Sequence, residues 1–148
     1  MYRWVNKYVG IPFKSGGRTS DGCDCYGLVR MVLKNEYSLI LPMLDGKYID
    51  ALDTETTKEL FRQYVPMICG KRIAEPEEKA IAVIKTQGLA THVALYAGDG
   101  FIIHTMLNTG TVCERLSNPT LTGRIEGWYR VSEGYSTGES VYNGTTGI

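Results

Sequence analysis

The spacing of hydrophobic residues changes once along this chain of 148 residues. Before about residue 80, apolar positions recur three and four residues apart, which predicts amphipathic helices. After that point they tend to alternate with polar positions, which predicts strands. Helices followed by strands joined through tight turns are typical of an α+β fold. We therefore expect N-terminal helices packed on a central antiparallel β-sheet of about five strands.

Three helices are expected in the first half, over about 2–9, 25–35 and 54–64. Their apolar faces consist of Trp4, Val5, Tyr8 and Val9 in the first, Leu28, Val29, Val32 and Leu33 in the second, and Leu60, Phe61 and Tyr64 in the third. Asp53 or Thr54 is expected to cap the third helix. Pro66 is expected to end it, because proline disfavours the helical conformation in the residue before it.

The strands are expected at 80–86, 91–97, 101–106, 111–116 and 127–131. Turn-forming residues separate them, and the acidic stretch 75–78 before them is predicted to be a solvated loop. These elements make one folded domain over 1–133. Residues 134–148 are rich in Ser, Thr, Gly and Tyr without clear periodicity, so we expect a tail that is flexible or ordered only by a partner.

Composition narrows the functional classes. Hydrophobic residues make up 43% of the chain and charged residues 22%, as in ordinary globular proteins. Sixteen basic and sixteen acidic residues cancel, which argues against a protein that binds nucleic acid mainly through charge. No apolar run approaches the roughly 18 residues of a membrane-spanning helix, so no membrane insertion is expected. No apolar segment follows the positive charge near Met1, so we also expect no secretory signal and synthesis in the cytoplasm.

A glycine-rich loop over 15–22 leads into the central predicted helix, and a cysteine stands at the junction. The loop lacks the G-x-x-x-x-G-K-[ST] pattern of a phosphate-binding loop. Asp24 is expected to cap the helix, which places Cys25 in its first turn. Unpaired amides and the positive end of the helix dipole favour a thiolate there and can hold an oxyanion. The simpler alternative is that Cys25 is a small buried apolar residue.

The chain has two histidines, His92 and His104, and they flank one predicted hairpin. If its loop is the three residues 98–100, Ala97 pairs with Phe101 and both imidazoles share one face of the sheet. A two-residue loop would put them on opposite faces. The three-residue loop is therefore the prediction that allows the two imidazoles to act together.

The same alternation predicts what covers each face of the hairpin. The face opposite the histidines carries Val93, Leu95, Phe101 and Ile103. On the histidine face, Ala94 is small, so we expect the start of the central helix to pack there. Cys25 and the two histidines would then lie in a line, in the order nucleophile, general base and orienting group.

Zinc binding is the main alternative use of these side chains. Its possible ligands are Cys23, Cys25, His92 and His104. The usual pair of ligands separated by two to four residues is absent. We therefore expect no metal and no cofactor.

Three motifs in this order resemble those of the NlpC-type cysteine peptidases, which are murein endopeptidases with a reduced papain-like fold. The motifs are Gly16-Gly17 followed by Asp24-Cys25-Tyr26-Gly27-Leu28-Val29, then His92-Val93-Ala94-Leu95-Tyr96, then Gly98-Asp99-Gly100-Phe101-Ile102-Ile103-His104. The resemblance covers about residues 5–130 and implies the same fold. It implies Cys25 as nucleophile, His92 as base and His104 as the third polar residue. It also implies hydrolysis of a peptide stem of peptidoglycan, by analogy at the bond between γ-D-glutamate and the diamino acid.

The resemblance extends to the substrate groove. The residues expected to bind substrate are Phe13, Gly16, Gly17, Arg18, Asp24 and Tyr26. The family commonly has a tyrosine twelve positions before the nucleophile, at the oxyanion side, and here that position is Phe13, which has no hydroxyl. Arg18 or Arg30 could meet the acidic substrate, and the alternative for each is an ordinary surface charge.

The Gly-Gly-Arg loop, Tyr26 and the final Gly-Trp-Tyr-Arg resemble the subgroup encoded in bacteriophage tail modules. This resemblance implies other phage tail proteins as partners and a virion that carries the protein to the cell wall. Two alternatives remain open. One is a structural tail-assembly subunit that keeps the peptidase fold for contacts, and the other is a papain-like amidase or acyltransferase.

Overall fold

The computed structural model describes residues 1–44, 54–86 and 88–132. The predicted tail at 134–148 and the possible cap Asp53 lie outside these residues. Among the described residues, no helix is long and apolar enough to cross a membrane.

Three helices form in the first half of the chain, as predicted. They are α1 (Val5–Tyr8), α2 (Cys25–Tyr37) and α3 (Thr54–Ile68). The first ends before Val9, whose backbone is extended and whose surface is 44% exposed, so its predicted burial was wrong. The third continues through Pro66 to Ile68, so the predicted end at that proline was also wrong. Proline removes one amide donor, but the residues after it can still adopt helical angles.

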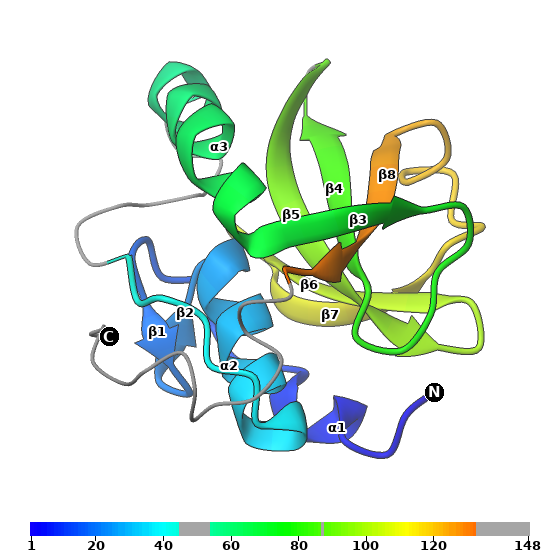
Figure 1. Cartoon of the computed structure of the whole chain (residues 1–148). Coiled ribbons are helices and arrows are strands. Elements are labelled where there is room, and N and C mark those ends of the chain that lie inside the picture. Colours follow the sequence, from blue (N-terminus) through cyan, green and yellow to red (C-terminus); the bar gives the residue numbers. More distant parts are fainter. Residues whose placement is uncertain (45–53, 87, 133–148) are drawn as a thin grey trace.

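The second half forms a six-stranded antiparallel sheet, which confirms the α+β class. Its strands are β3 (Cys69–Ile73), β4 (Ile81–Thr86), β5 (Leu89–Gly98), β6 (Phe101–Met106), β7 (Gly110–Arg115) and β8 (Ile125–Val131). Their order in the sheet is β3-β8-β4-β5-β6-β7. The edge strand β3 was not predicted from the sequence. Figure 1 shows the sheet curling, with α2 and α3 along one side of it. A separate small hairpin, β1 (Arg18–Thr19) and β2 (Gly22–Cys23), forms within the glycine-rich loop.

Two hydrophobic clusters lie on the two faces of the sheet. The buried side chains of α2 share one cluster with Val93, Leu95 and Ile103. Ala94 and Ile102 belong to a second cluster. The body of α2 therefore packs on the more apolar face, opposite the histidines, whereas the expectation from the sequence concerned only the start of the helix. Large branched side chains on that face offer more apolar area to bury than Ala94 does.

The β5–β6 hairpin reaches the predicted register by another route. Leu95 pairs with Ile103, as a three-residue loop requires, but Gly98 rather than Ala97 pairs with Phe101. The loop thus has two residues, and the register shift between Tyr96 and Gly98 leaves Ala97 as the extra residue of a β-bulge. The bulge restores the alternation that a two-residue loop alone would have reversed, so both histidines remain on one face.

Candidate active site

The start of α2 is fixed by its predicted cap. The Asp24 carboxylate accepts a hydrogen bond from the Gly27 amide at 2.7 Å and another from the Gly16 amide at 3.1 Å. The Arg18 guanidinium donates to the same carboxylate at 2.8 Å. Burial raises the pKa of Asp24, and Arg18 and the two amides oppose this effect. The ion pair between Arg18 and Asp24 joins the glycine-rich loop to the start of α2, beside Cys25.

Glycines allow the loop and the helix to touch through their backbones. A Cβ atom at Gly27 would lie 2.1 Å from the carbonyl oxygen of Gly17, and one at Gly17 would lie 2.3 Å from that of Gly22. Both distances are far below contact distance, so neither position accepts a side chain unless the backbone moves. This close approach explains the two glycines on either side of the Asp24-Cys25 pair.

The two histidines lie together, as their predicted register requires. His92 Nε2 is 2.9 Å from His104 Nδ1, and both rings are buried. The other ring nitrogen of His104, Nε2, lies 2.5 Å from a carboxylate oxygen of Glu114. A second oxygen of Glu114 accepts from the Asn118 side-chain amide at 3.0 Å. The imidazole pair therefore continues into an acidic group that the sequence analysis did not identify.

The place of Glu114 beside His104 follows from the register of β6 and β7. In the β6–β7 pairing His104 lies opposite Val112, so Glu114, two residues further, points to the same face. An acidic residue on the face of a strand that carries a buried histidine is a candidate partner for it.

Burial keeps both imidazoles neutral near neutral pH. Desolvation, followed by the charges of His104 and Arg124, lowers the pKa of His92 to about 3. Desolvation also lowers the pKa of His104, although the hydrogen bond and charge of Glu114 oppose it. A neutral ring has a lone pair that can accept a proton, but the low pKa makes His92 a weak base unless the thiolate formed beside it stabilises the imidazolium.

Cys25 opens α2, the helix that contacts β5 and β6, which carry the two histidines. It is buried in the cluster that includes Val93, the residue after His92. The structure thus places Cys25 at the start of a helix that contacts both strands of the histidine pair.

The residues expected to bind substrate lie around the helix start, and several are buried. The Arg18 side chain is 6% exposed; besides Asp24 it contacts the Met43 and Gly17 carbonyl oxygens. Tyr26 is buried, and its hydroxyl donates to the Pro42 carbonyl oxygen. Arg30 is also buried and donates to the Leu41 carbonyl oxygen. These contacts give the three residues structural roles, and a role in substrate binding stays a prediction.

Phe13 is half-buried and forms an isolated bridge with Cys23, which ties the segment before the loop to β2. Within the described part of the chain, no three His, Cys, Asp or Glu side chains converge as a metal site.

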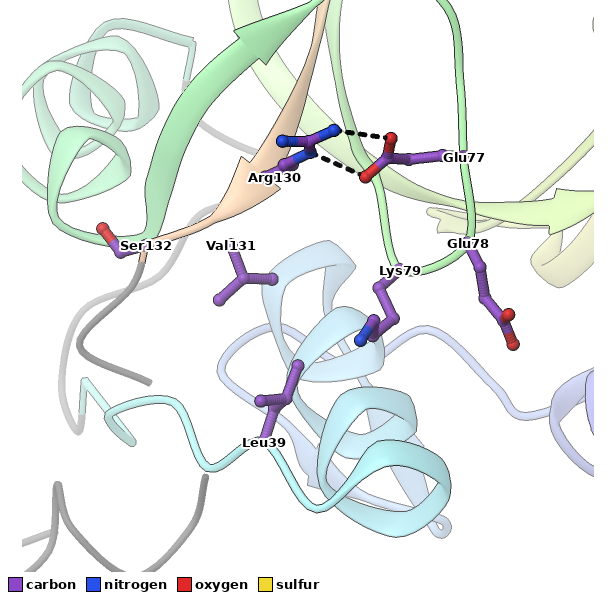
Figure 2. Close-up of a pocket in the computed structure, with 7 residues that line it drawn as sticks. All are labelled: Leu39, Glu77, Glu78, Lys79, Arg130, Val131 and Ser132. Carbon is purple, nitrogen blue, oxygen red and sulfur yellow. Dashed lines mark hydrogen bonds and ion pairs between the residues drawn. The ribbon is translucent and has the colours of Figure 1, made fainter. Parts of the chain in front are cut away.

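A cavity of about 230 Å³ lies elsewhere, between the end of β8 and the segment before β4. It is lined by Leu39, Glu77, Glu78, Lys79, Arg130, Val131 and Ser132. Figure 2 shows Glu77 and Arg130 joined across this region by two hydrogen bonds, at 2.8 and 3.1 Å. None of its lining residues is a predicted site residue, so this cavity does not mark the predicted active site.

Solved structures of related fold support the architecture. An NlpC/P60 family protein of Bacillus cereus ATCC 10987 superposes with a TM-score of 0.60 at 20% identity, over 85% of this chain and 37% of that one. A protein of Staphylococcus aureus Mu50 described as similar to lipoprotein, NLP/P60 family, gives 0.58 at 20% identity, over 86% and 39%. NlpC1 of Trichomonas vaginalis gives 0.56 at 19% identity, over 85% and 41%. At these identities the likeness shows the fold alone.

Among curated proteins, the chain is 20% identical over 114 residues to the murein DD-endopeptidase MepS/murein LD-carboxypeptidase of Escherichia coli K12. The match covers 76% of this chain and 51% of that protein, so the chain spans about half the length of the curated relatives it matches. The family model of the NlpC/P60 family matches residues 10–130, which include the capped start of α2 and the histidine hairpin. On that match, the chain belongs to the NlpC/P60 family.

Proposed function

We propose that this protein is a cysteine peptidase that hydrolyses peptide-stem bonds of bacterial peptidoglycan. The observation that carries the proposal is the buried pair His92 and His104, held on the strands that contact the helix opened by Cys25. Family membership and the murein endopeptidase activity in the name of the curated relative support the substrate class.

In the proposed reaction His92 takes the thiol proton and the Cys25 sulfur attacks the scissile carbonyl carbon. The backbone amide at the start of α2 holds the resulting oxyanion. His92 then returns the proton to the leaving amine as the carbon–nitrogen bond breaks, which leaves a thioester on Cys25. A water molecule, deprotonated by His92, hydrolyses the thioester and releases the new carboxyl group.

In this reaction the Cys25 thiol has to reach His92. Because the body of α2 packs on the face opposite the histidines, the thiol has to approach His92 from the first turn of the helix. The capped, glycine-packed start of α2 is the part of the helix with the contacts to hold such a position.

The direct test compares the protein with Cys25→Ala, and with Cys113→Ala as a matched control outside the proposed triad. Purified protein and the Cys113→Ala variant should solubilise peptidoglycan, whereas Cys25→Ala should not. Mass spectrometry of the released stems identifies the bond, which we propose to be that between γ-D-glutamate and the diamino acid. Equal solubilisation by the protein and Cys25→Ala would rule out the peptidase.

Thiol reactivity gives a second measurement. Burial raises the pKa of Cys69 to about 12 and also raises the pKa of Cys113. An activated Cys25 should therefore react with iodoacetamide near pH 7 before either of them, and equal or slower alkylation of Cys25 would contradict a thiolate at this position.

A structural role in phage tail assembly is the second candidate, favoured by Phe13 at a position where the resemblance expects a hydroxyl. If this candidate is right, phage tails need the protein for assembly, and the unaltered protein and Cys25→Ala support assembly equally well. Neither the unaltered protein nor Cys25→Ala should then solubilise peptidoglycan. Association with a phage tail and delivery on a virion belong to both candidates and are tested by detecting the protein in purified particles.

A further inference from the structure

The Glu114 carboxylate lies at the end of the imidazole pair, on a strand that supplies no residue to the predicted triad. It comes from β7, reaches His104 Nε2 at 2.5 Å, and is 20% exposed. His104 Nδ1 in turn lies 2.9 Å from His92 Nε2. The contacts therefore form one unbranched chain from the carboxylate through both rings.

Hydrogen-bond roles along this chain follow from its acidic end. An ionised carboxylate can only accept, so His104 must carry its proton on Nε2. With Nε2 protonated, the Nδ1 of a neutral His104 has a lone pair and accepts from His92 Nε2–H. His92 Nδ1 is then the nitrogen without a proton, and it is the one free to take the proton of a thiol.

Other contacts hold the carboxylate itself in place. Its second oxygen accepts from the Asn118 side-chain amide at 3.0 Å. The Asn118 side-chain oxygen accepts in turn from the Thr120 amide at 3.0 Å. Arg124, the nearby cation that lowers the pKa of both histidines, donates to the Lys85 and Thr120 carbonyl oxygens. The loop after β7 thus fixes the orientation of Glu114.

We propose that Glu114 is a positioning residue, whose carboxylate sets the tautomer of His104 and, through it, leaves Nδ1 of His92 as the basic nitrogen. The inference rests on the proposed function, in which His92 is the general base. Glu114 orients His104 as the carboxylate of a carboxylate–histidine pair does, and His104 in turn orients His92. The residue acts through His104 and does not touch the substrate.

Histidine tautomers are measured directly from ¹⁵N chemical shifts, independently of any catalysis. In the folded protein near pH 7, His92 and His104 should both be protonated on Nε2. Glu114→Ala should leave His104 as a mixture of the two tautomers. His92, which donates to His104, should then also populate both tautomers. Glu77→Gln, which alters an exposed carboxylate paired with Arg130, should leave both histidines unchanged.

Peptidoglycan hydrolysis supplies the second readout. Loss of the partner that orients a reacting side chain typically costs about 10- to 100-fold in activity, so Glu114→Ala should lower kcat by that factor with little change in KM. Asn118→Ala keeps the carboxylate but removes its support, and should give a smaller loss and a smaller tautomer shift. Thermal melting checks that each variant is folded.

The two proposals fail separately. Unchanged tautomers in folded Glu114→Ala, or His104 protonated on Nδ1 in the unaltered protein, would overturn the role of Glu114 even if Cys25 proves essential. Conversely, the predicted tautomers in a protein that does not cleave peptidoglycan would uphold the hydrogen-bond chain and reject the peptidase.

Discussion

At the scale of one residue, His92 shows how burial keeps an imidazole neutral. The imidazole has no room for a hydration shell, so its charged form is disfavoured and its pKa falls to about 3. In the unfolded chain the same residue has a pKa of about 6.5. The difference links the ionisation of a proposed catalytic group to the stability of the fold.

This link predicts acid sensitivity in a defined range. Between about pH 6.5 and pH 3 the unfolded chain binds a proton at His92 that the folded chain does not. The free energy of unfolding should therefore fall as the pH falls, with a contribution from this residue of up to about 1.4 kcal/mol per pH unit. Urea titrations between pH 7 and pH 5, above the main range of the carboxylates, measure the slope. His92→Asn should make that slope smaller, and an unchanged slope would show that His92 is not the buried neutral base described here.

Single residues divide into those that local sequence predicts and those that only tertiary contacts reveal. Asp24 was predicted as the helix cap because capping is a local property, and the structure confirms it. The ion pair that buries Arg18 was missed, because it depends on how the glycine-rich loop folds back on the helix. Glu114 was missed for a similar reason, since its role appears only when β6 and β7 are placed in register.

The element that sets the position of Cys25 is the start of α2 against the glycine-rich loop. Glycine inside a helix ordinarily destabilises it by up to about 1 kcal/mol relative to alanine. Here the Cβ of an alanine at position 27 would lie 2.1 Å from the Gly17 carbonyl oxygen, a backbone atom that cannot rotate away. In Gly27→Ala, the steric clash with the Gly17 carbonyl oxygen opposes the gain in helix propensity, and the clash should cost more than the propensity gains.

Gly27→Ala should therefore destabilise the protein, by about 1–3 kcal/mol. Chemical denaturation measures the change, and Lys34→Ala, at an exposed position of the same helix, should shift stability by less than about 0.5 kcal/mol. Gly27→Ala should also lose peptidoglycan hydrolysis if the glycine-rich loop and Cys25 move apart. A stabilising effect of Gly27→Ala would mean that the loop yields easily and does not fix the helix start.

Most elements were predictable because the hydrophobic period is a strong local signal, and five of the six strands of the sheet begin and end within two residues of their expected positions. The strand β3 was not, since Cys69–Ile73 contains Lys71 and Arg72 and lacks alternation, and it is held at the edge by pairing with β8. The bulge at Ala97 was also beyond prediction. Loop length and bulge compensate each other in register, so the sequence pattern was compatible with either arrangement.

At the scale of the whole molecule, the N-terminal segment joins the sheet to the proposed nucleophile. Gly10 and Ile11 exchange backbone hydrogen bonds of 2.9 Å with Thr111 on the edge strand β7. In the next residue, the Pro12 carbonyl oxygen accepts from the Cys23 amide, and Phe13 forms an isolated bridge with the same cysteine. One short stretch therefore spans from the strand of Glu114 to the residues just before Cys25, and fixes the distance between the two ends of the proposed site.

Hydrogen exchange can test whether this segment stays bound to the sheet edge in solution. The amides of Thr111 and Cys113 point to the same side of β7, since successive amides of a strand alternate. Thr111 donates to the Ile11 carbonyl oxygen at 2.9 Å, at a position that the N-terminal segment covers. Its amide should therefore exchange at least about tenfold more slowly than that of Cys113 after correction for unfolded-chain rates, because exchange requires the segment to detach. Equal rates would show that residues 10–13 leave the edge readily, and the start of α2 would then need another anchor to hold Cys25 near the histidines.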